Sequence, residues 1–447
     1  MAISVAIIGS GPAGFYTADA LLKCGEDCQI DIIERLPTPY GLIRGGVAPD
    51  HQTTKRVARK YERTALVDEV NYYGNVEINK DVSLAELRDM YDAVVLAVGA
   101  PGDRKLTIPG ADKYGVFGSA AFVGWYNGHP DFRDLDPDLN ISTAVVIGNG
   151  NVAVDCARVL LRTPSGMSKS DLPDHVGDVI YAAPITDVHM VGRRGPVDAK
   201  FTNVELREMG ELSETVPQMD TAQLPDDIEA AVAGLEGRER RLKERNLKTL
   251  ATFTERAADE KPKRVHFDFF AQPVEILGGE RVEGIRFERT EVIDGRATGT
   301  GETFDIDCGL VIPAIGYRAD PVDGAPYDEK QAIIPNNEGR VDDGLYAVGW
   351  IKRGPTGVIS SNRPDGEIVA QHIEGDFAGG ASAKPGRAGF EAALRERNVR
   401  WISFDDWQRI DEMEKAAADG EAPRRKFVTV EEMLDALNNG NAEAANG

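Results

Sequence analysis

The stretch that decides the fold runs from Ile3 to Gly14 and reads ISVAIIGSGPAG. Its first half is almost wholly apolar and rich in β-branched residues, as a buried parallel strand is, and it opens directly into the pattern G-x-G-x-x-G. In such a turn Gly9 permits a tight bend, Gly11 lets the backbone approach a pyrophosphate, and Gly14 lets the following helix pack closely on the sheet. The pattern predicts a strand–turn–helix unit that binds a dinucleotide at the helix N-terminus.

A carboxylate stands where such a unit needs one. The apolar run Gln29–Ile33 ends at Glu34, twenty residues after Gly14. An acidic residue at this spacing accepts hydrogen bonds from a ribose of the bound dinucleotide. The intervening helix is expected over Phe15–Lys23, with Gly25 as its stop. Because strand, turn, helix and acid are in register, we interpret this stretch as a binding site rather than as an ordinary glycine-rich turn.

The same pattern occurs a second time. Thr143–Ile147 predicts a strand, Gly148–Ala153 reads GNGNVA, a G-x-G-x-x-A turn, and Val154–Leu161 predicts a helix. One nucleotide needs only one such turn, so two turns in one chain favour two bound dinucleotides. If the two face each other, hydride can pass between them.

The second unit ends in the opposite charge. Its partner strand, Asp187–Gly192, leads into Arg193 and Arg194 at the place where the first unit has Glu34. A carboxylate there would repel a 2′-phosphate, whereas two guanidiniums would hold it by charge-assisted hydrogen bonds. The second site is therefore predicted to prefer NADP over NAD.

Two further segments are predicted to line a cofactor. Residues 35–51 contain three prolines and three glycines and predict a long irregular loop that follows the cofactor bound at Glu34. Near the C-terminal end, Leu345–Val348 predicts a strand and a helix is expected to begin at Val358, where its amides would face a ring carbonyl. The other expected elements are a helix over Thr53–Thr64 and strands over Val76–Val82, Asp92–Ala100, Val265–Phe270, Val282–Phe287 and Cys308–Ile315.

Composition excludes several functional classes. The chain has 447 residues, with 51 basic against 74 acidic residues and a formal net charge of −23, which argues against general nucleic-acid binding. It has no run of 18 apolar residues, so no membrane span is expected. Its four cysteines lack a Cys-x-x-Cys pair, which disfavours disulfide reductases and fits the reduced thiols of a cytoplasmic protein.

A basic stripe stands out in this acidic chain. A helical pattern runs from about Asp226 to Leu250. If it continues past Gly234 and Gly237, Ile228, Ala231, Leu235 and Leu242 share one face, and a different face carries four cations that form either a solvated surface or a docking site for an acidic partner. These cations are Arg238, Arg241, Arg245 and Lys248.

With these motifs in order, the chain resembles the NADPH–ferredoxin reductases of the adrenodoxin reductase type. The resemblance extends from the N-terminus to near Leu437. Its most specific blocks follow the family's order: GSGPAG (Gly9–Gly14), PTPYGLIRGGVAPDH (Pro37–His51), GNGNVAVD (Gly148–Asp155), GRR (Gly192–Arg194), FTNVELRE (Phe201–Glu208) and GWIKRGPTGVI (Gly349–Ile359).

The resemblance implies an α/β fold of two Rossmann-like domains with central parallel sheets, like those of glutathione reductase, and FAD and NADP(H) as cofactors. An FAD-binding domain is expected over 1–103 and 325–447, the second part with a C-terminal helical extension, and an NADP-binding domain over 104–324. FAD would contact Ala13, Glu34, Leu42, Val82, Trp350, Gly357, Val358 and Ile359, beside the glycines of the first turn. NADP(H) would contact Asn149, Gly150, Asn151, Val152, Arg193, Arg194 and Glu205, with Gly357 also at the nicotinamide.

The activity that the resemblance implies is hydride transfer from NADPH to the flavin, followed by single-electron transfers to a ferredoxin-type iron–sulfur protein. No catalytic side chain and no metal site are expected. His51 and Glu205 are candidates for proton handling, although each is at least as readily explained by a structural hydrogen bond. In the family the partner is acidic, so docking on this chain would depend on a local basic patch.

Three alternatives share parts of this pattern. The small subunit of a glutamate synthase has the same two-nucleotide core, but it carries a Cys-rich iron–sulfur segment ahead of the first strand, which is not expected here. A flavin monooxygenase would need a substrate cavity that the sequence does not indicate. A non-enzymatic protein that binds both nucleotides without turnover belongs to a different class, and bleaching of the flavin by NADPH distinguishes it.

Overall fold

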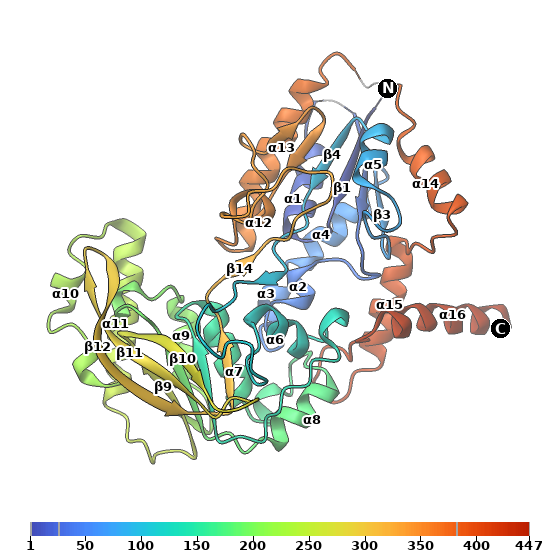
Figure 1. The fold of residues 1–447 in the computed structure, drawn as a ribbon. Coiled ribbons are helices and arrows are strands. Elements are labelled where there is room, and N and C mark those ends of the chain that lie inside the picture. The colour runs from blue at the N-terminus through green and yellow to red at the C-terminus, as the bar shows by residue number, and fades with distance from the viewer. Residues whose placement is uncertain (1, 26, 381–382, 447) are drawn as a thin grey trace. The chain divides into compact units, whose positions relative to one another are not determined.

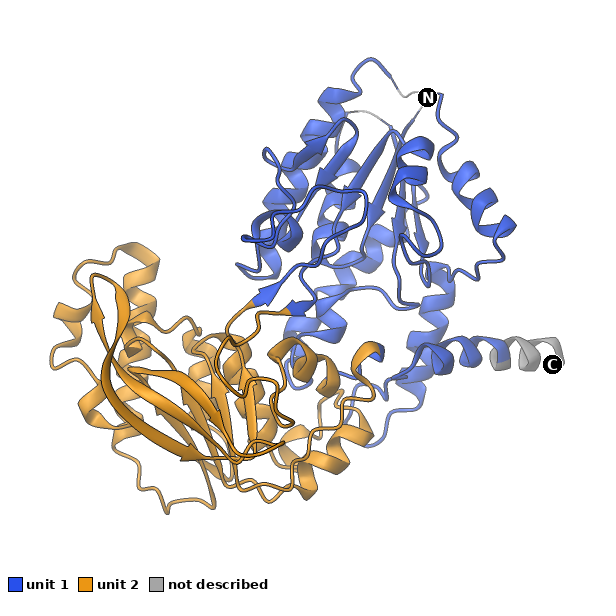
Figure 2. Ribbon diagram, in the orientation of Figure 1, with its two compact units in different colours: residues 1–102, 127–130, 317–447 blue, residues 103–126, 131–316 orange. Residues whose placement is uncertain are grey.

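The computed structural model describes residues 2–25, 27–380 and 383–446. Two compact units divide the chain (Figure 2): unit 1 comprises residues 1–102, 127–130 and 317–447, and unit 2 comprises residues 103–126 and 131–316. The sequence predicts that the NADP-binding domain ends at residue 324 and that the FAD-binding domain resumes at residue 325. In the structure residues 317–324 belong to unit 1, where the ring of Tyr317 lies 5.7 Å from that of Trp350.

Unit 1 is built on a six-stranded sheet in the order β15-β16-β4-β1-β2-β3, parallel except for the edge pair β15–β16 (Figure 1). Both faces are covered, so β1 is buried along its whole length, as its continuous apolar sequence predicts. The strands are β1 (Ile3–Ile8), β2 (Cys28–Ile33), β3 (Val70–Tyr73), β4 (Ala93–Leu96), β15 (Arg340–Asp342) and β16 (Leu345–Ala347).

Helices α1 (Pro12–Leu21) and α13 (Asn362–Asp376) pack directly against each other in unit 1 (Figure 1). A Cβ at Gly366 would lie 2.8 Å from the backbone of Thr17, so this close approach requires glycine. The remaining helices of the unit are α2 (Leu42–Gly45), α3 (Gln52–Lys55), α4 (Ala58–Ala65), α5 (Leu84–Met90), α12 (Trp350–Arg353), α14 (Gly386–Glu396), α15 (Phe404–Ala416) and α16 (Val430–Asn446).

Unit 2 contains a five-stranded parallel sheet in the order β13-β6-β7-β9-β8, together with a three-stranded antiparallel sheet. The parallel strands are β6 (Thr143–Ile147), β7 (Asp187–Val191), β8 (Thr215–Gln218), β9 (Lys263–Asp268) and β13 (Leu310–Pro313). The antiparallel strands are β10 (Ala271–Leu277), β11 (Gly284–Ile293) and β12 (Arg296–Asp307). The helices are α6 (Ser119–Tyr126), α7 (Asn151–Leu161), α8 (Asp174–Ala182), α9 (Asn203–Gly210), α10 (Ile228–Ala231) and α11 (Gly237–Thr254).

One strand of the sequence-based prediction is wrong. The run Val76–Val82 forms only an isolated bridge, between Ile78 and Val82, because Asn75 and Asn79 adopt positive φ angles of 61° and 66° that interrupt an extended chain. The strand of this region is β3, which begins six residues earlier and pairs with β2.

Two predicted helices are interrupted, and a third begins late. The helix over Thr53–Thr64 is divided into α3 and α4 by a turn with three-residue hydrogen bonds, such as Val57 N–H to the Thr54 carbonyl. The pattern from Asp226 is divided into α10 and α11 at Gly237, whose φ is +55°. Val358 precedes a 3₁₀ turn (Ile359–Ser361), and α13 begins only at Asn362. No helix of the described ranges has the length and apolar composition needed to cross a bilayer.

Candidate dinucleotide sites

The turn between β1 and α1 leaves open space at its central glycine. Gly9 has φ +109°, and a Cβ there would lie 2.5 Å from the Ala97 carbonyl oxygen. A Cβ at Gly14 would lie 2.1 Å from the Gly9 carbonyl oxygen, so both outer glycines are required by packing. Gly11, by contrast, has no heavy atom within 4 Å of the corresponding position. The open side of this glycine is a cradle that a phosphate group can enter.

Glu34 is held at the same turn. The backbone N–H and the hydroxyl of Ser10 donate to its Oε2 at 3.0 and 2.7 Å, and the Leu36 N–H donates to Oε1 at 3.3 Å. Ser10 is fully buried. A carboxylate has about four acceptor positions, so this one retains capacity for ribose hydroxyls. The acid predicted from spacing therefore lies beside the first glycine turn.

The loop 35–51 folds back over the first turn. Tyr40 N–H donates to the Ser10 carbonyl at 3.1 Å, and a Cβ at Gly41 would lie 3.0 Å from the Gly11 Cα. Leu42 begins the short helix α2 with its side chain 39% exposed. Val82 is buried, 1% exposed, and its carbonyl accepts the Asn79 N–H at 2.8 Å.

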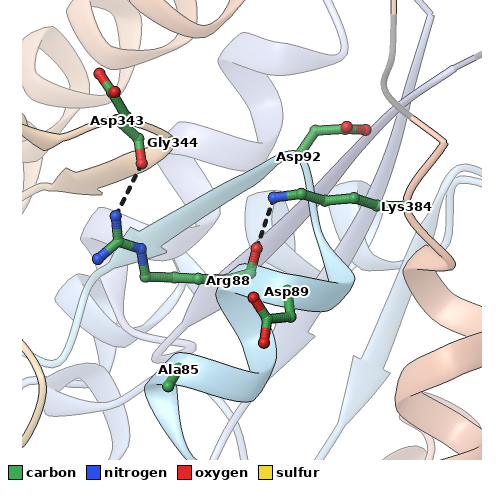
Figure 3. A pocket seen from close by; sticks show the side chains of 7 residues that line it. All are labelled: Ala85, Arg88, Asp89, Asp92, Asp343, Gly344 and Lys384. Carbon is green, nitrogen blue, oxygen red and sulfur yellow. Dashed lines mark hydrogen bonds between the residues drawn. The ribbon is translucent and has the colours of Figure 1, made fainter.

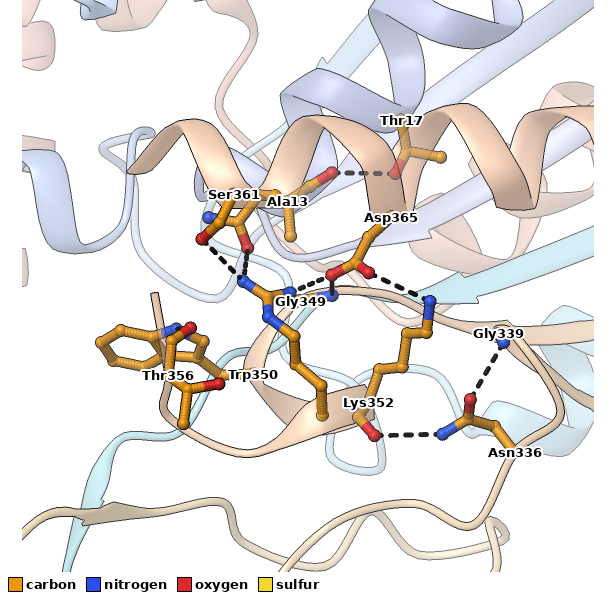
Figure 4. A network of polar contacts seen from close by, with 12 residues as sticks. Ala13, Thr17, Asn336, Gly339, Gly349, Trp350, Lys352, Thr356, Ser361 and Asp365 are labelled. Atoms are coloured by element: carbon orange, nitrogen blue, oxygen red, sulfur yellow. Dashed lines mark hydrogen bonds and ion pairs between the residues drawn. The ribbon is translucent and has the colours of Figure 1, made fainter. Parts of the chain in front are cut away.

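The segment that follows β16 is organised by Asp365, a residue for which the sequence carried no signal (Figure 4). Its carboxylate accepts the Gly349 N–H at 3.2 Å, pairs with Lys352 at 3.0 Å, and pairs with Arg353. Arg353 also donates to Asn362 Oδ1 at 3.0 Å. Burial, with a smaller effect of Arg353, lowers the pKa of Lys352. Asp365 on α13 thus ties α12 to the helix that packs against α1.

Three expected flavin contacts lie in or beside the loop that this network holds. Trp350 Nε1 donates to the Thr356 carbonyl at 3.2 Å (Figure 4), which fixes the indole against its own loop. Gly357 has φ +89°, and a Cβ there would lie 2.2 Å from Ser361 Oγ. Val358 is 63% exposed, so the loop presents its backbone and an uncovered apolar side chain. Ala13, on the first turn of α1, lies close to Gly349, where a Cβ would come within 2.7 Å of the alanine methyl.

The second turn, in unit 2, repeats the geometry of the first. Gly148 has φ +141°, and a Cβ there would lie 2.4 Å from the Ala314 carbonyl oxygen, whereas Gly150 has open space within 4 Å. The Asn149 side chain packs against Gly192 at the end of β7, where a Cβ would lie 1.7 Å from its Nδ2. In the described part of the chain, Asn149 Oδ1 is a buried oxygen that accepts no hydrogen bond. Asn151 and Val152 form the first residues of α7.

The two arginines after β7 reach solvent. Arg193 is exposed, and its carbonyl accepts the Thr290 hydroxyl at 2.7 Å. Arg194 is 34% exposed in its side chain and pairs with Asp198 at 2.9 Å. Both guanidiniums are therefore accessible to an anion at the carboxyl end of β7.

Glu205 is positioned by a buried cation that sequence reasoning missed. The helix α9 is capped by Thr202, whose hydroxyl accepts the Glu205 N–H at 3.4 Å. Arg158 on α7 is fully buried and pairs with Glu205 at 3.1 Å, with Glu208 at 3.5 Å and with Asp155 at 2.8 Å. An arginine inside the apolar sequence of α7 was the available signal, because such a residue is rarely buried without carboxylate partners.

The four cations of the basic stripe all lie on α11, although the predicted longer helix is interrupted before Gly237. Arg238, Arg241, Arg245 and Lys248 are all exposed on α11, and Lys248 pairs with Glu244. The apolar face expected from Ile228 to Leu242 is wrong, because Gly237 separates those residues into different elements. The face of α11 that is buried instead comprises Lys243, Asn246, Leu247, Leu250 and Phe253.

A cavity of about 330 Å³ lies by the amino ends of β4 and β16 in unit 1, whereas the first glycine turn follows the carboxyl end of β1 (Figure 3). Its two cations are already engaged: Lys384 donates to the carbonyls of Arg88 and Tyr91, and Arg88 pairs with Asp342. Ligands of open α/β sheets bind at the carboxyl ends of the strands, so this cavity is not a dinucleotide site.

Two glycine turns on parallel sheets, one followed by an acid and the other by two arginines, define an oxidoreductase of the two-dinucleotide class. Residues 3–203 match the family model described as pyridine nucleotide-disulphide oxidoreductase.

Relatives and solved structures are similar over nearly the whole chain. The chain is 40% identical to the mitochondrial NADPH:adrenodoxin oxidoreductase of Arabidopsis thaliana over 98% of this chain and 96% of that protein. It is 39% identical to the NADPH-ferredoxin reductase FprA of Mycobacterium leprae over 96% and 97% of the two chains. The structure of Mycobacterium tuberculosis FprA in complex with NADPH superposes with a TM-score of 0.94 at 37% identity, covering 98% of this chain and 100% of that one. The chain belongs to the family of NADPH:adrenodoxin oxidoreductases and NADPH-ferredoxin reductases.

Proposed function

We propose that this protein transfers electrons from NADPH, through FAD, to a ferredoxin-type iron–sulfur protein. The observation that carries the proposal is the contrast between its two turns. Each has an open central glycine, but the first is followed by Glu34 and the second by Arg193 and Arg194. Relatives with NADPH-dependent reductase names are similar over almost their full length, which favours this function over a glutamate synthase small subunit.

The residues of unit 1 fit FAD. Gly11 leaves room for the pyrophosphate, Glu34 retains acceptor capacity for a ribose, and the loop 35–51 follows the turn. The Asp365 network holds α12, which leads into the loop that bears Gly357 and Val358, and the amides of this loop would donate to a flavin ring. FAD, when bound, supplies the change from two-electron to one-electron chemistry, and the protein supplies binding and orientation.

The residues of unit 2 fit NADP(H). Gly150 leaves the same opening for a pyrophosphate, and the guanidiniums of Arg193, which is exposed, and Arg194, which is partly exposed, would hold a 2′-phosphate. Arg158 fixes Glu205 by an ion pair, which places a carboxylate on α9 in a defined position. A thiol is not needed for this chemistry. Burial raises the pKa of Cys156 and raises that of Cys308 to about 12, which keeps both protonated and unreactive.

The proposed docking site for the iron–sulfur protein is the stripe of Arg238, Arg241, Arg245 and Lys248 on α11. An acidic partner is repelled by a chain of net charge −23, so a local concentration of exposed cations is where attraction can exceed repulsion. The attraction between exposed charges is screened within about 10 Å at 0.1 M salt. Electron delivery to the partner should therefore weaken as salt rises.

The experiment that tests the function has two stages. Purified protein should be yellow, and NADPH added under anaerobic conditions should bleach it. NADPH-driven reduction of cytochrome c should then depend on added ferredoxin and fall with rising salt. A colourless protein, or one that NADPH does not bleach, refutes the enzymatic function. If NADPH bleaches the protein but no ferredoxin of a panel supports reduction of cytochrome c, the proposal that the electron acceptor is a ferredoxin is refuted.

A further inference from the structure

Helix α11, which is labelled in Figure 1, also buries polar side chains, on the face opposite its basic stripe. Lys243 is only 9% exposed, and Asn246 is 1% exposed. Lysine is almost never buried unless it is paired, and a buried amide needs hydrogen-bond partners. These two residues therefore have a structural task that the exposed cations of the same helix do not share.

That task is to hold the segment between β7 and α9. Lys243 Nζ donates to the Ala199 carbonyl, and Asn246 Nδ2 donates to the Phe201 carbonyl at 3.0 Å. One turn further along, Thr249 Oγ1 accepts from Asn203 Nδ2 at 3.0 Å. Residues three apart on a helix lie on one face, so a single face of α11 makes all three hydrogen bonds to residues 199–203.

The other side of this segment is bonded to the second glycine turn. The N–H groups of Lys200 and Phe201 both donate to the Asn149 carbonyl, at 2.6 and 3.2 Å. The Thr202 N–H donates to Asn151 Oδ1 at 2.8 Å. The segment thus directs carbonyls toward α11 and amides toward the turn. One layer of backbone connects the helix to the residues that open α7.

The two carbonyls that face α11 belong to buried residues, and the segment follows the arginine pair along the chain. Ala199 is 3% exposed and Phe201 is fully buried, so water does not compete for these hydrogen bonds. Burial lowers the pKa of Lys243; Glu239 and Asp198 oppose this, and Arg194 lowers the pKa further. Arg194 pairs with Asp198 at 2.9 Å, and Asp198 ends the 3₁₀ turn Pro196–Asp198 that packs against α11, so Lys243 lies on the helix next to the proposed 2′-phosphate site.

We propose that Lys243 and Asn246 are positioning residues for NADP(H): through residues 199–201 they set the position of the turn Asn149–Asn151. The inference rests on the proposed assignment of NADP(H) to unit 2. Backbone amides of a dinucleotide turn must converge on the pyrophosphate, and a misplacement of about 1 Å in a binding group can cost a large part of its contribution. Neither residue needs to contact the nucleotide for this effect.

The test compares variants of the buried face with a matched variant of the exposed face. Lys243→Met and Asn246→Leu keep side-chain size and remove the donor, and Arg240→Met changes an exposed cation of the same helix. With a dye as acceptor, we expect Asn246→Leu to raise the KM for NADPH and for NADH by the same factor, about 3- to 10-fold, at unchanged kcat. Lys243→Met should raise both at least as much. Arg240→Met should leave both unchanged.

A merely structural role would show a different pattern. Lost stability alone would lower the melting temperature and flavin content without a split between KM and kcat. If Lys243→Met does not fold, Asn246→Leu and Thr249→Val, which removes one peripheral acceptor, decide the question; for Thr249→Val a rise of about 2-fold in KM is expected.

Two negative results are distinguishable. If KM is unchanged in folded variants of the buried face, while Arg193→Ala/Arg194→Ala still loses selectivity for NADPH, the positioning role is refuted and the NADP(H) site stands. If that arginine variant also behaves like the parent protein, the assignment of NADP(H) to unit 2 fails, and the positioning role fails with it.

Discussion

The arginine pair after β7 provides a prediction whose size follows from its surroundings. Replacing Arg193 and Arg194 together by Ala should weaken the binding of NADPH much more than the binding of NADH. A hydrogen bond to a charged group contributes about 1.5–3 kcal/mol. Arg193 is exposed and Arg194 is partly exposed and shares its charge with Asp198 at 2.9 Å, so the lower end applies to each. The pair together then contributes about 3 kcal/mol, or about 100-fold in affinity.

The assay is steady-state dye reduction with NADPH and with NADH. The KM for NADPH should rise by about 100-fold, whereas the KM for NADH, which lacks the 2′-phosphate, should change less than about 3-fold. At saturating NADPH, kcat should be unchanged, because the phosphate is remote from the reacting ring. Arg207→Ala, which removes another exposed arginine of unit 2 that pairs with Glu211, is the control. Equal rises in KM for the two nucleotides would refute the 2′-phosphate role.

Three further predictions test other parts of the structure. Charge reversal at Arg241 and Arg245 should lower ferredoxin-dependent cytochrome c reduction at least 10-fold at low salt and leave dye reduction intact; a parallel fall in dye reduction would contradict the docking site. Gly11→Ala should fold but lose bound flavin, because its Cβ points into open space, whereas Gly14→Ala should destabilise the fold itself, because its Cβ would lie 2.1 Å from a carbonyl oxygen. Flavin content and urea unfolding separate these outcomes, and normal flavin content in Gly11→Ala would count against the cradle. Burial, together with the adjacent His189, lowers the pKa of His266 below its usual 6.5, so the unfolded chain binds a proton more readily than the folded one and stability should fall as pH falls below about 6.5. Urea midpoints from pH 7.5 to 5 should decline less steeply in His266→Gln, and an unchanged slope would exclude His266 as the cause.

The acid end of the pH profile has a second source in the same cluster. Asp187 accepts hydrogen bonds from Arg264 and from His266, and these outweigh burial and lower its pKa. A lowered carboxyl pKa stabilises the fold above the ordinary value of 3.8, and that stabilisation is lost as pH falls through the folded value. The decline due to His266 should therefore precede that due to Asp187 as the solution is acidified.

The glycine turns and the charged residues that follow the strands could be predicted from the sequence, because few other residue types can take those positions. Gly9 and Gly14 are excluded from carrying a side chain by backbone atoms a few residues away or on the next strand, and the continuous apolar run before them identifies a buried parallel strand. The charge after each strand, Glu34 or Arg193, follows from a fixed spacing in one βα unit. These features recur at fixed spacings in a βα unit, so the sequence pattern alone was sufficient to predict them.

The pairing of strands and the interruption of helices were harder to predict from the sequence, because several segments or conformations compete for the same place. Val70–Tyr73 and Val76–Val82 are both short and both contain β-branched or aromatic residues, and the positive φ angles of Asn75 and Asn79 exclude the second from the sheet. In the same way, the helical periodicity from Asp226 did not show that Gly237 would take a left-handed conformation. Asparagine and glycine tolerate both conformations, and tertiary contacts select one.

The sequence by itself determined two dinucleotide turns, their glycines and the opposite charges that distinguish them. Only the tertiary structure decided which polar groups support those turns from a distance. Asp365 lies 16 residues beyond the Gly349 amide it binds, Arg158 meets Glu205 across 47 residues, and Lys243 reaches Ala199 across 44. Each is a charged residue in a helix, and the sequence does not show which group it contacts. Its burial and its partner exist only once the helices are packed, because packing removes water and leaves a specific carbonyl or carboxylate as the remaining partner.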